Sequence, residues 1–285
     1  MANVLSGKEV AEALNQKMIA DVEALKEKGI TPRLAILRIG ERDDDISYER
    51  GATKRCEKIG VAVKNVLLPA DVDQATLMAA IDDLNKDDSV HGVLMFRPMP
   101  EQIDQDAACE ALDPAKDIDA VGRGSLATVF VGKGAGYAPC TAQACMEILK
   151  HYNIETRGKR AVVIGRSLVI GRPVAMLLMH ANATPTICHT KTVDTAAIAK
   201  EADILVVAAG VMRSVGAEYV RPGQTVIDVG IHFNEETQKL AGDVKFEEVE
   251  PIVENITPVP GGVGSVTTSV LVSHVVDAAK KKAGL

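Results

Sequence analysis

Aromatic residues are scarce in this chain of 285 residues, which contains no Trp, four Tyr and four Phe. Ala, Val, Ile and Leu supply most of the apolar side chains instead. That balance suits helices packed on parallel strands better than a β-sandwich. The apolar fraction of 47% is ordinary for a globular protein, and the length allows one large or two modest α/β domains.

Long apolar runs and an excess of positive charge are also missing. The apolar run at residues 204–212 is far shorter than the ~20 residues that cross a bilayer. Residues 1–10 have neither the basic start nor the apolar stretch of a signal peptide, so we expect a cytoplasmic protein with no membrane partner. A formal net charge of −7 argues against a nucleic-acid partner, although it leaves room for a local basic pocket that binds an anionic small molecule.

Paired cysteines are absent from the sequence, because the five cysteines are scattered and none forms a CxxC pair. They are Cys56, Cys109, Cys140, Cys145 and Cys188. We expect them to be reduced, mostly structural thiols. No second ligand lies at a fitting spacing from His189, so we expect no metal site.

The chain does contain a regular alternation of strand-like and helical segments. Short apolar runs separated by helical patterns predict βαβ units and a largely parallel sheet. The runs that we interpret as strands are residues 33–39, 61–68, 90–96, 160–165, 184–189, 203–209 and 225–230. The turn-rich segment at 113–122 interrupts the alternation. We therefore expect two α/β domains: residues 1–140, joined by a final helix at 266–285, and residues 141–265.

The most distinctive local pattern is VVIGRSLVIGRP, in which a strand runs into Gly165 and a helix begins near Gly171. Such a turn lets backbone N–H groups and a helix N-terminus face a phosphate. We therefore predict a dinucleotide site that includes Arg166 and Ser167. The spacing is G-x5-G rather than the usual G-x-G-x-x-G, so a tight βα turn without a ligand explains this pattern about as well.

The residues at the end of the next strand favour NADP over NAD. NAD sites commonly place Asp or Glu there, where the acid binds the ribose 2′-hydroxyl group. This chain has Cys188, His189, Thr190 and Lys191 instead. Together with Arg166, the last two could receive a 2′-phosphate. NADP is therefore the expected cofactor, with NAD as the alternative.

Two irregular segments have more than one interpretation. The Gly/Pro-rich residues 257–267 suit a loop that lines a cleft, or a linker between domains. Asp117 and Asp119 lie on a turn-rich stretch, where carboxylates are usually solvated or cap a turn. From the residues alone, a structural role for these two acids is favoured over a catalytic one.

The stretch ISYERGATKRCEKIG predicts a short helix opened by Ser47 and closed by Gly60. Tyr48 and Ala52 are four residues apart and share one face, whereas Lys54 lies roughly 240° round the helix from Tyr48. The helix is either an ordinary surface helix or an active-site helix that has lost a catalytic cation.

Together these segments resemble the methylenetetrahydrofolate dehydrogenase/cyclohydrolase family over nearly the whole chain. The shared motifs are LSGKEVA, YERGATKRCEKIG, GVLMFRPMPEQID, DPAKDIDAVG, APCTAQA, VVIGRSLVIGRP, ICHTKT, VIDVGI and TPVPGGVG. The resemblance implies two α/β domains with a folate cleft between them, a Rossmann-like doubly wound parallel sheet in the C-terminal one, and a homodimer. It also implies NAD(P)-dependent oxidation of 5,10-methylene-tetrahydrofolate to the 5,10-methenyl form, which many members hydrolyse to 10-formyl-tetrahydrofolate.

The resemblance also implies where the sites lie. Tyr48 is implied to stack on or hydrogen-bond the substrate and Asp119 to contact the pterin, so these two are the predicted catalytic residues. The residues predicted to surround the folate are Tyr48, Ala52, Phe96, Arg97, Pro98, Asp119, Pro260, Gly261, Gly262, Val263 and Gly264. Those predicted to hold the cofactor are Gly165, Arg166, Ser167, Gly171, Thr190, Lys191 and Ile231.

Two departures from the family pattern concern a single reaction. The family's active-site helix usually reads Y-x-x-x-K, with the lysine acting in the cyclohydrolase step, and here Ala52 takes the lysine position. The usual strand-end motif is Q-L-P-L-P, whose glutamine partners that lysine, and here Phe96 takes the glutamine position. Because two coupled partners are missing together, we expect a helix that has lost its hydrolytic lysine. Smaller departures, which affect the fit of the substrate, are Ala142, Ala144, Ser265 and Val266.

The expected activity is therefore NADP-dependent dehydrogenation with weak or absent cyclohydrolase activity. Lys54 would rescue hydrolysis only if the helix shifted by two residues, and Arg97 stays protonated and makes a poor general base. The nearest alternative is the bifunctional enzyme, with water activated by another group. A regulator that binds folate or a nucleotide without catalysis, and a Rossmann oxidoreductase of another substrate, are the remaining alternatives.

Overall fold

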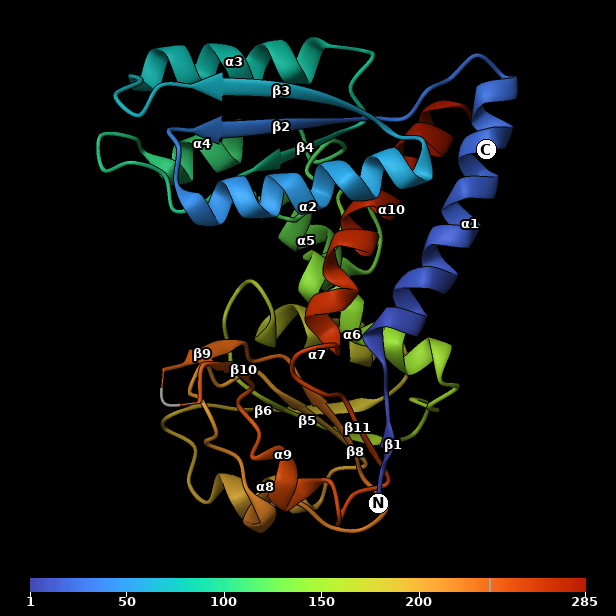
Figure 1. Cartoon of the computed structure of the whole chain (residues 1–285), viewed down its shortest axis with the longest axis vertical. Coiled ribbons are helices and arrows are strands. Elements are labelled where there is room, and N and C mark those ends of the chain that lie inside the picture. The colour runs from blue at the N-terminus through green and yellow to red at the C-terminus, as the bar shows by residue number, and fades with distance from the viewer. Residues whose placement is uncertain (236) are drawn as a thin grey trace. The chain divides into compact units, whose positions relative to one another are not determined.

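The computed structural model describes the whole chain except residue 236 and divides into two compact units (Figure 1). The three-stranded unit, named for its sheet, consists of residues 13–140 and 268–285. The six-stranded unit consists of residues 1–12 and 141–267. Each unit combines helices with a parallel sheet, so the α/β class that the alternation predicts is confirmed.

The first twelve residues depart from the expected domain 1–140. β1 (Asn3–Val4) pairs in parallel with β11 (Asn255–Ile256), so that Asn3 lies opposite Asn255. The side-chain amide of Asn3 also donates to Asn255 Oδ1 at 3.2 Å. Residues 1–12 therefore group with the six-stranded unit, and a strand of two residues carries too little pattern to reveal this in the sequence.

The three-stranded unit has β2 (Arg33–Ile39) at the centre of its sheet, between β3 (Ala62–Leu68) and β4 (Gly92–Met95). β2 and β4 are almost entirely buried, as is typical of parallel strands covered on both faces. Helices α3 and α4 pack on these two strands through a shared core. The helices that lie wholly or largely in this unit are α1 (Gly7–Glu27), α2 (Asp43–Ile59), α3 (Gln74–Lys86), α4 (Gln105–Ala111), α5 (Arg123–Val131) and α10 (Thr267–Lys282).

The six-stranded unit has one parallel sheet in the order β1-β11-β8-β7-β5-β6. Its longer strands are β5 (Arg160–Ile164), β6 (Thr184–Cys188), β7 (Ile204–Val207) and β8 (Thr225–Asp228). β6 and β7 lie on opposite sides of β5, and the carboxyl ends of strands at such a reversal form a ligand crevice in doubly wound folds. The other elements are α6 (Cys140–His151), α7 (Gly171–His180), α8 (Thr195–Lys200), α9 (Phe246–Val249) and the antiparallel pair β9 (His232–Asn234) and β10 (Lys239–Ala241).

Helix α2 begins earlier than the Ser47 that the sequence suggests. Its first turn contains the three acidic residues from Asp43 to Asp45, where negative charge is favourable beside a helix N-terminus. Ser47 therefore lies inside the helix. Gly60 ends the helix in the left-handed conformation, with φ of +89°, as predicted.

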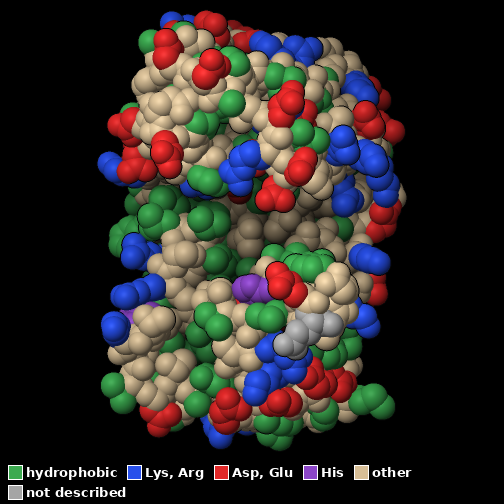
Figure 2. All heavy atoms as spheres, turned by 60° about the vertical axis from the view of Figure 1, so that its left-hand side comes forward, with side chains coloured by type: hydrophobic (Ala, Val, Ile, Leu, Met, Phe, Trp, Pro, Cys, Tyr) green, Lys and Arg blue, Asp and Glu red, His purple; other side chains and the backbone are tan. Residues whose placement is uncertain are grey.

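Acidic and basic side chains are interspersed on the face of the molecule shown in Figure 2. Within the described part of the chain, we find no helix with the length and hydrophobicity that a bilayer crossing requires. All five cysteines are buried free thiols. Among residues 1–235 and 237–285, no three His, Cys, Asp or Glu side chains gather in a way that would hold a metal ion.

Candidate functional site

Tyr48 lies on α2 and has an aromatic neighbour from the end of β4. Its ring centroid is 5.9 Å from that of Phe96, and the two planes meet at 85° in an edge-to-face contact. Tyr48 keeps 38% of its surface exposed, whereas Ala52, one turn further along the helix, is fully buried. Lys54 is exposed and lies off this face, as the spacing predicts. Tyr48 and Ala52 therefore present a phenol and a methyl group on the face that they share.

The hydroxyl group of Tyr48 is a neutral hydrogen-bonding group. Burial of the hydroxyl group is the main cause that holds the pKa of Tyr48 well above its usual range, and the neighbouring Cys140 and Asp119 raise it further. A hydrogen bond with the side chain of Thr268 acts in the opposite direction. Because the raised pKa keeps the proton on the oxygen at physiological pH, Tyr48 can donate a hydrogen bond but does not serve as a general base.

Asp119 stands at the end of a turn that Asp117 builds. The buried Asp117 carboxylate accepts the N–H groups of Val121 at 2.9 Å and of Gly122 at 3.0 Å. Asp119 Oδ1 accepts the N–H of Cys140 at 3.0 Å, at the first residue of α6. Asp117 therefore has the structural role that its sequence position favours. Asp119, in contrast, offers a half-buried carboxylate that a helix N-terminus orients.

Three further residues belong to this group, although sequence reasoning missed them. His274 Nδ1 lies 2.8 Å from the Ile118 carbonyl oxygen, and Cys140 Sγ donates to the same oxygen at 3.3 Å. Both contacts fix the backbone next to the catalytic acid predicted from the sequence. Thr268, at the start of α10, contacts the phenol. Cys140 falls in the APCTAQA motif, and the final helix is expected to join this unit, but no local pattern places His274 or Thr268 at this site.

Arg97 and Pro98 follow Phe96 and are joined by a cis peptide bond. The guanidinium group of Arg42, just before α2, donates to the Pro98 carbonyl oxygen at 3.1 Å. Burial raises the pKa of the Cys109 thiol on α4, and the positive charge of Arg97 opposes this effect. The folate residues predicted in this unit thus lie around the carboxyl end of β4, with Arg97 beside α4.

The remaining predicted folate residues, Pro260 to Gly264, belong to the six-stranded unit. Gly261 has φ of +103°, a backbone conformation that favours glycine, and its carbonyl oxygen accepts the N–H of Gly7 at 2.8 Å. A Cβ atom on Gly7 would lie 1.9 Å from the Gly262 carbonyl oxygen, so this close approach requires glycine. The loop is thus fastened to the start of α1. Its contact with folate, and the folate cleft between the domains, stay predictions.

The six-stranded unit has a cavity of about 390 Å³ at the carboxyl ends of β5, β6 and β7. Its lining residues are Ile164, Gly165, Arg166, Ser167, His189, Thr190, Thr195, Ala208, Ala209, Val211, Ser214, Val215 and Tyr219. The cavity wall therefore includes four of the predicted cofactor residues. The other three do not line it. Gly171 packs closely against the backbone of Gly165, Lys191 is exposed, and Ile231 is 61% exposed.

Close backbone contacts require the glycines at both ends of the cofactor turn. Gly165 has φ of +130°, and a Cβ atom there would lie 2.2 Å from the Ala208 carbonyl oxygen. A Cβ atom on Gly171 would lie 2.2 Å from the Gly165 carbonyl oxygen. Between them, Ser167 Oγ accepts the N–H groups of Ile170 at 3.2 Å and of Gly171 at 3.5 Å. The G-x5-G spacing therefore marks a specific turn that leads into α7.

The chemistry of this cavity fits a dinucleotide. Ser214 Oγ lines it, is buried, and has no hydrogen-bond partner within the described chain, so it is available to a ligand. Arg166 and Thr190 supply a guanidinium and a hydroxyl group, and both residues are exposed. Among the described residues that line the cavity, none is acidic. This combination fits NAD(P), and the missing acid fits the 2′-phosphate of NADP.

The buried Asp243 supports the loop at the end of β7, and the buried Asp228 holds the backbone of Asp243 in place. One oxygen of Asp243 accepts the N–H of Gly210 at 2.9 Å, and the other lies 2.7 Å from His232 Nε2. Asp228, at the end of β8, accepts three backbone N–H groups. Burial raises the pKa of Asp228 to about 7 against the effect of these hydrogen bonds, and the Asp243 carboxylate adds to the rise. Because Gly210 directly follows two residues of the cavity wall, Asp243 holds that part of the wall in place.

Two family models match the chain. One is described as the catalytic domain of tetrahydrofolate dehydrogenase/cyclohydrolase and matches residues 5–119. The other is described as the NAD(P)-binding domain of the same enzyme and matches residues 139–283.

Curated and solved relatives resemble the chain over its whole length. It is 47% identical over 280 residues to the bifunctional protein FolD of Alkaliphilus oremlandii, with 98% of each chain covered. The structure of the bifunctional enzyme FolD, a methylenetetrahydrofolate dehydrogenase/cyclohydrolase from Campylobacter jejuni, superimposes with a TM-score of 0.95 at 37% identity and covers 99% of this chain and 100% of that one. FolD from Trypanosoma brucei, complexed with NADP and an inhibitor, gives a TM-score of 0.91 at 35% identity over 100% and 99% of the two chains.

Proposed function

The chain belongs to the tetrahydrofolate dehydrogenase/cyclohydrolase family, and from this premise we propose that it oxidises 5,10-methylene-tetrahydrofolate to 5,10-methenyl-tetrahydrofolate with NADP as hydride acceptor. Hydrolysis of the product to 10-formyl-tetrahydrofolate is weak or absent. The observation that carries the proposal is the buried Ala52 on the face of Tyr48, with Phe96 against the phenol ring, where the family pattern has lysine and glutamine.

Hydride transfer does not require an acid–base group of the protein. The hydride leaves the methylene carbon as the folate nitrogen lone pair forms a delocalised cation, so no side chain has to accept a proton. NADP supplies the acceptor carbon when it is bound, and the protein's part is to position the reacting carbon. Tyr48, as a neutral donor, and Asp119, as an oriented acceptor, are suited to hold the pterin for this step.

Hydrolysis of the methenyl group needs proton transfers for which this site has no suitable group at the usual position. Water has to lose a proton and the ring nitrogen of the tetrahedral intermediate has to gain one. A positioned acid/base group typically contributes ~10²–10⁴-fold to such a step. Ala52 and Phe96 carry no titratable group, and the raised pKa of Tyr48 keeps its phenol protonated. The exchange therefore weakens the second reaction and spares the first.

The alternative is a bifunctional enzyme, and the names of the relatives favour it, because both the Alkaliphilus oremlandii protein and the Campylobacter jejuni structure are called bifunctional. The proton transfers would then need another group in this chain. Lys54 is exposed on a different face of α2, and Arg97 lies beside α4 and stays protonated. Neither matches the position of the missing lysine, so we favour the single reaction.

NADP is the proposed hydride acceptor, with NAD as the alternative. Arg166 and Thr190 in the cavity wall, with Lys191 next to them in the sequence, form a basic, hydroxyl-bearing rim suited to a 2′-phosphate. The Trypanosoma brucei relative is complexed with NADP. A kcat/KM that is at least as high with NAD as with NADP would contradict this preference.

We also propose that the protein is a homodimer, as the family resemblance implies. Analytical ultracentrifugation of the purified protein over a wide range of concentration tests this. A species of 30.2 kDa at every concentration would contradict the dimer.

The deciding experiment follows reduced cofactor and methenyl product separately. The purified protein is mixed with 5,10-methylene-tetrahydrofolate and NADP in a buffer in which spontaneous hydrolysis of the methenyl product is slow. We expect the methenyl product to accumulate one-for-one with NADPH. If NADPH exceeds the methenyl product faster than the spontaneous rate allows, hydrolysis is catalysed and the bifunctional alternative is correct.

Two variants sharpen this result. The double substitution Ala52→Lys with Phe96→Gln restores the family's pair. We expect hydrolysis to rise by about 10²-fold, the lower end of what a positioned acid/base group contributes. Lys54→Gln is the matched control on the same helix and should change neither rate. A loss of hydrolysis in that control would identify Lys54 as the group that activates water.

A further inference from the structure

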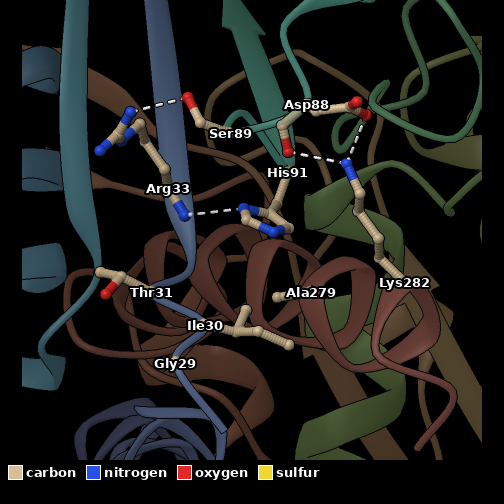
Figure 3. Close-up of a pocket in the computed structure, with 9 residues that line it drawn as sticks. All are labelled: Gly29, Ile30, Thr31, Arg33, Asp88, Ser89, His91, Ala279 and Lys282. Atoms are coloured by element: carbon tan, nitrogen blue, oxygen red, sulfur yellow. Dashed lines mark hydrogen bonds and ion pairs between the residues drawn. The ribbon is translucent and has the colours of Figure 1, made fainter.

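A second cavity, of about 490 Å³, lies at the amino ends of β2 and β4 in the three-stranded unit (Figure 3). Its walls are the loop before β2, the loop before β4 and the last turns of α10. The lining residues are Gly29, Ile30, Thr31, Arg33, Asp88, Ser89, His91, Ala279 and Lys282. Phe96 follows the opposite, carboxyl end of β4. The cavity is therefore separate from the Tyr48 group, and its function does not depend on the folate reaction.

Basic side chains dominate the polar part of this cavity. Figure 3 shows the imidazole of His91 between the side chains of Arg33 and Lys282. Arg33 Nη1 donates to Ser89 Oγ at 2.7 Å, which uses one of the five N–H donors of a guanidinium group. Lys282 Nζ lies 2.6 Å from Asp88 Oδ1 and 2.7 Å from the Asp88 carbonyl oxygen. Asp88 is exposed, so this ion pair is accessible to a competing anion.

His91 is placed as a hydrogen-bond donor. Its Nδ1 accepts the backbone N–H of Arg33 at 3.2 Å, so the neutral ring carries its proton on Nε2. Burial is the main cause that lowers the pKa of His91, and the positive charges of Lys282, Lys116 and Arg33 lower it further. Lys116 lies close by, with its ammonium group donating to three carbonyl oxygens. Three positive charges therefore act on this ring, and the carboxylates of Asp87 and Asp88 stand in the loop just before it.

We propose that this cavity binds a small organic anion whose phosphate or carboxylate group lies between Arg33 and Lys282 and whose apolar body lies against Ile30 and Ala279. The guanidinium and ammonium groups offer charge-assisted hydrogen bonds, which are the strong ones for an anion. The volume of about 490 Å³ falls within the ~300–1,000 Å³ of small-molecule sites and exceeds the needs of a bare phosphate. The anion competes with Asp88 for Lys282.

The test follows the ring signals of the histidines by NMR in the full-length protein, with His91→Gln to assign the signal of His91. Phenyl phosphate, benzoate and inorganic phosphate are the probes. We expect phenyl phosphate or benzoate to shift the His91 signal saturably and to raise its pKa, because a bound anion favours the charged ring. Tighter binding of phenyl phosphate identifies a phosphate ligand, and tighter binding of benzoate a carboxylate. His189, in the wall of the cofactor cavity, reports separately on binding there.

Charge variants show whether the cavity is the site. Arg33→Gln and Lys282→Gln should each weaken binding about tenfold, the loss expected for one charge-assisted hydrogen bond. Asp88→Asn should tighten it, because the competing carboxylate is removed. Lys86→Gln is the matched control, since it breaks an exposed Lys–Asp ion pair on α3 outside the cavity, and it should leave the affinity unchanged.

Two results would overturn the proposal. One is that none of the three probes shifts the His91 signal saturably. The other is that Arg33→Gln and Asp88→Asn bind the probes as tightly as the unmodified protein, because the charges would then serve only to fasten α10 to the loop before β4.

Discussion

The proposed cofactor site depends mainly on backbone groups, whereas the proposed folate site depends mainly on side chains. In the six-stranded unit, the cofactor turn relies on backbone groups and on Gly165 and Gly171, where added Cβ atoms would collide with carbonyl oxygens. In the three-stranded unit, the Tyr48 group relies on side chains that stand on a helix, a strand end and a turn. The first kind of site fails when an atom is added. The second kind can lose one reaction by a change of side chains while its elements keep their packing, as Ala52 and Phe96 suggest.

Gly165→Val should have the largest effect. The added Cβ would lie 2.2 Å from the Ala208 carbonyl oxygen, and φ of +130° is strained for a branched side chain. We expect the affinity for NADP, measured by calorimetry, to fall by more than about 100-fold, because overpacking forces the turn to move. Gly158→Asn is the control, since Gly158 has φ of +73° with open space around it. If Gly165→Val binds NADP as tightly as the unmodified protein does, the cofactor binds elsewhere.

Asp119→Asn should have the next largest effect, and this effect should concern the folate substrate rather than NADP. Its carboxylate is the oriented acceptor of the Tyr48 group, so we expect kcat/KM for the folate to fall about 100-fold, or about 2.7 kcal/mol of transition-state stabilisation. NADP affinity should not change, because Asp119 belongs to the other unit. Asp106→Asn, an exposed acid on α4, is the control. Unaltered folate kinetics in Asp119→Asn would exclude this residue from the pterin site.

Asp228→Asn tests the buried acids behind the cofactor cavity. Burial raises the pKa of Asp228 to about 7, so the folded state holds its proton more tightly than the unfolded state. A raised carboxyl pKa means that stability is lost as pH rises from about 4 through 7, by about 2 kcal/mol between pH 5 and pH 7. Urea unfolding at both pH values should show this loss, and Asp228→Asn should remove it while lowering stability at pH 5. Equal pH slopes for both proteins would contradict the raised pKa.

Gly51→Ala should have the smallest effect and the opposite sign. Gly51 lies in the middle of α2 with no atom within 4 Å of an added Cβ. Because glycine is a poor helix former, we expect the variant to gain about 0.5–1 kcal/mol of stability, measured as a higher urea midpoint. A loss of stability would show that this part of α2 is more crowded than the described contacts allow. Together with Gly165→Val, the substitution contrasts a glycine that a site requires with one that it does not.

The parts of the molecule that sequence reasoning predicts well are those with a local cause. Buried parallel strands read as short apolar runs, and their alternation with helices is sufficient to predict the two sheets. The cofactor turn is equally local, because a strand, a turn with glycines at both ends and a helix follow one another within twelve residues. Two of its side chains, Arg166 and Ser167, line the cavity, together with Thr190, which follows β6.

The parts that escape prediction depend on chain segments far apart in sequence. Thr268 and His274 reach the Tyr48 group from the last helix, and although that helix is expected to join this unit, no pattern near either residue places it at the site. The pairing of β1 with β11 is hidden for the same reason. Even the start of α2 at Asp43 escapes, because three consecutive acids suit an exposed loop as well as the first turn of a helix. Lys191, chosen for its charge beside a 2′-phosphate, and Ile231, chosen from the family resemblance, do not line the cavity, and their roles stay predictions.

The pairing of Asn3 with Asn255 also limits when the chain can finish folding during its synthesis. The two residues are 252 positions apart, so the first strand leaves the ribosome long before its neighbour exists. At ~5–20 residues per second, the wait is roughly 13–50 seconds. Completion of the three-stranded unit comes even later, because that unit includes residues 268–285 of the last helix. Neither unit can be completed until the segments from both of its distant parts have been translated, so native pairing in both units comes late in synthesis.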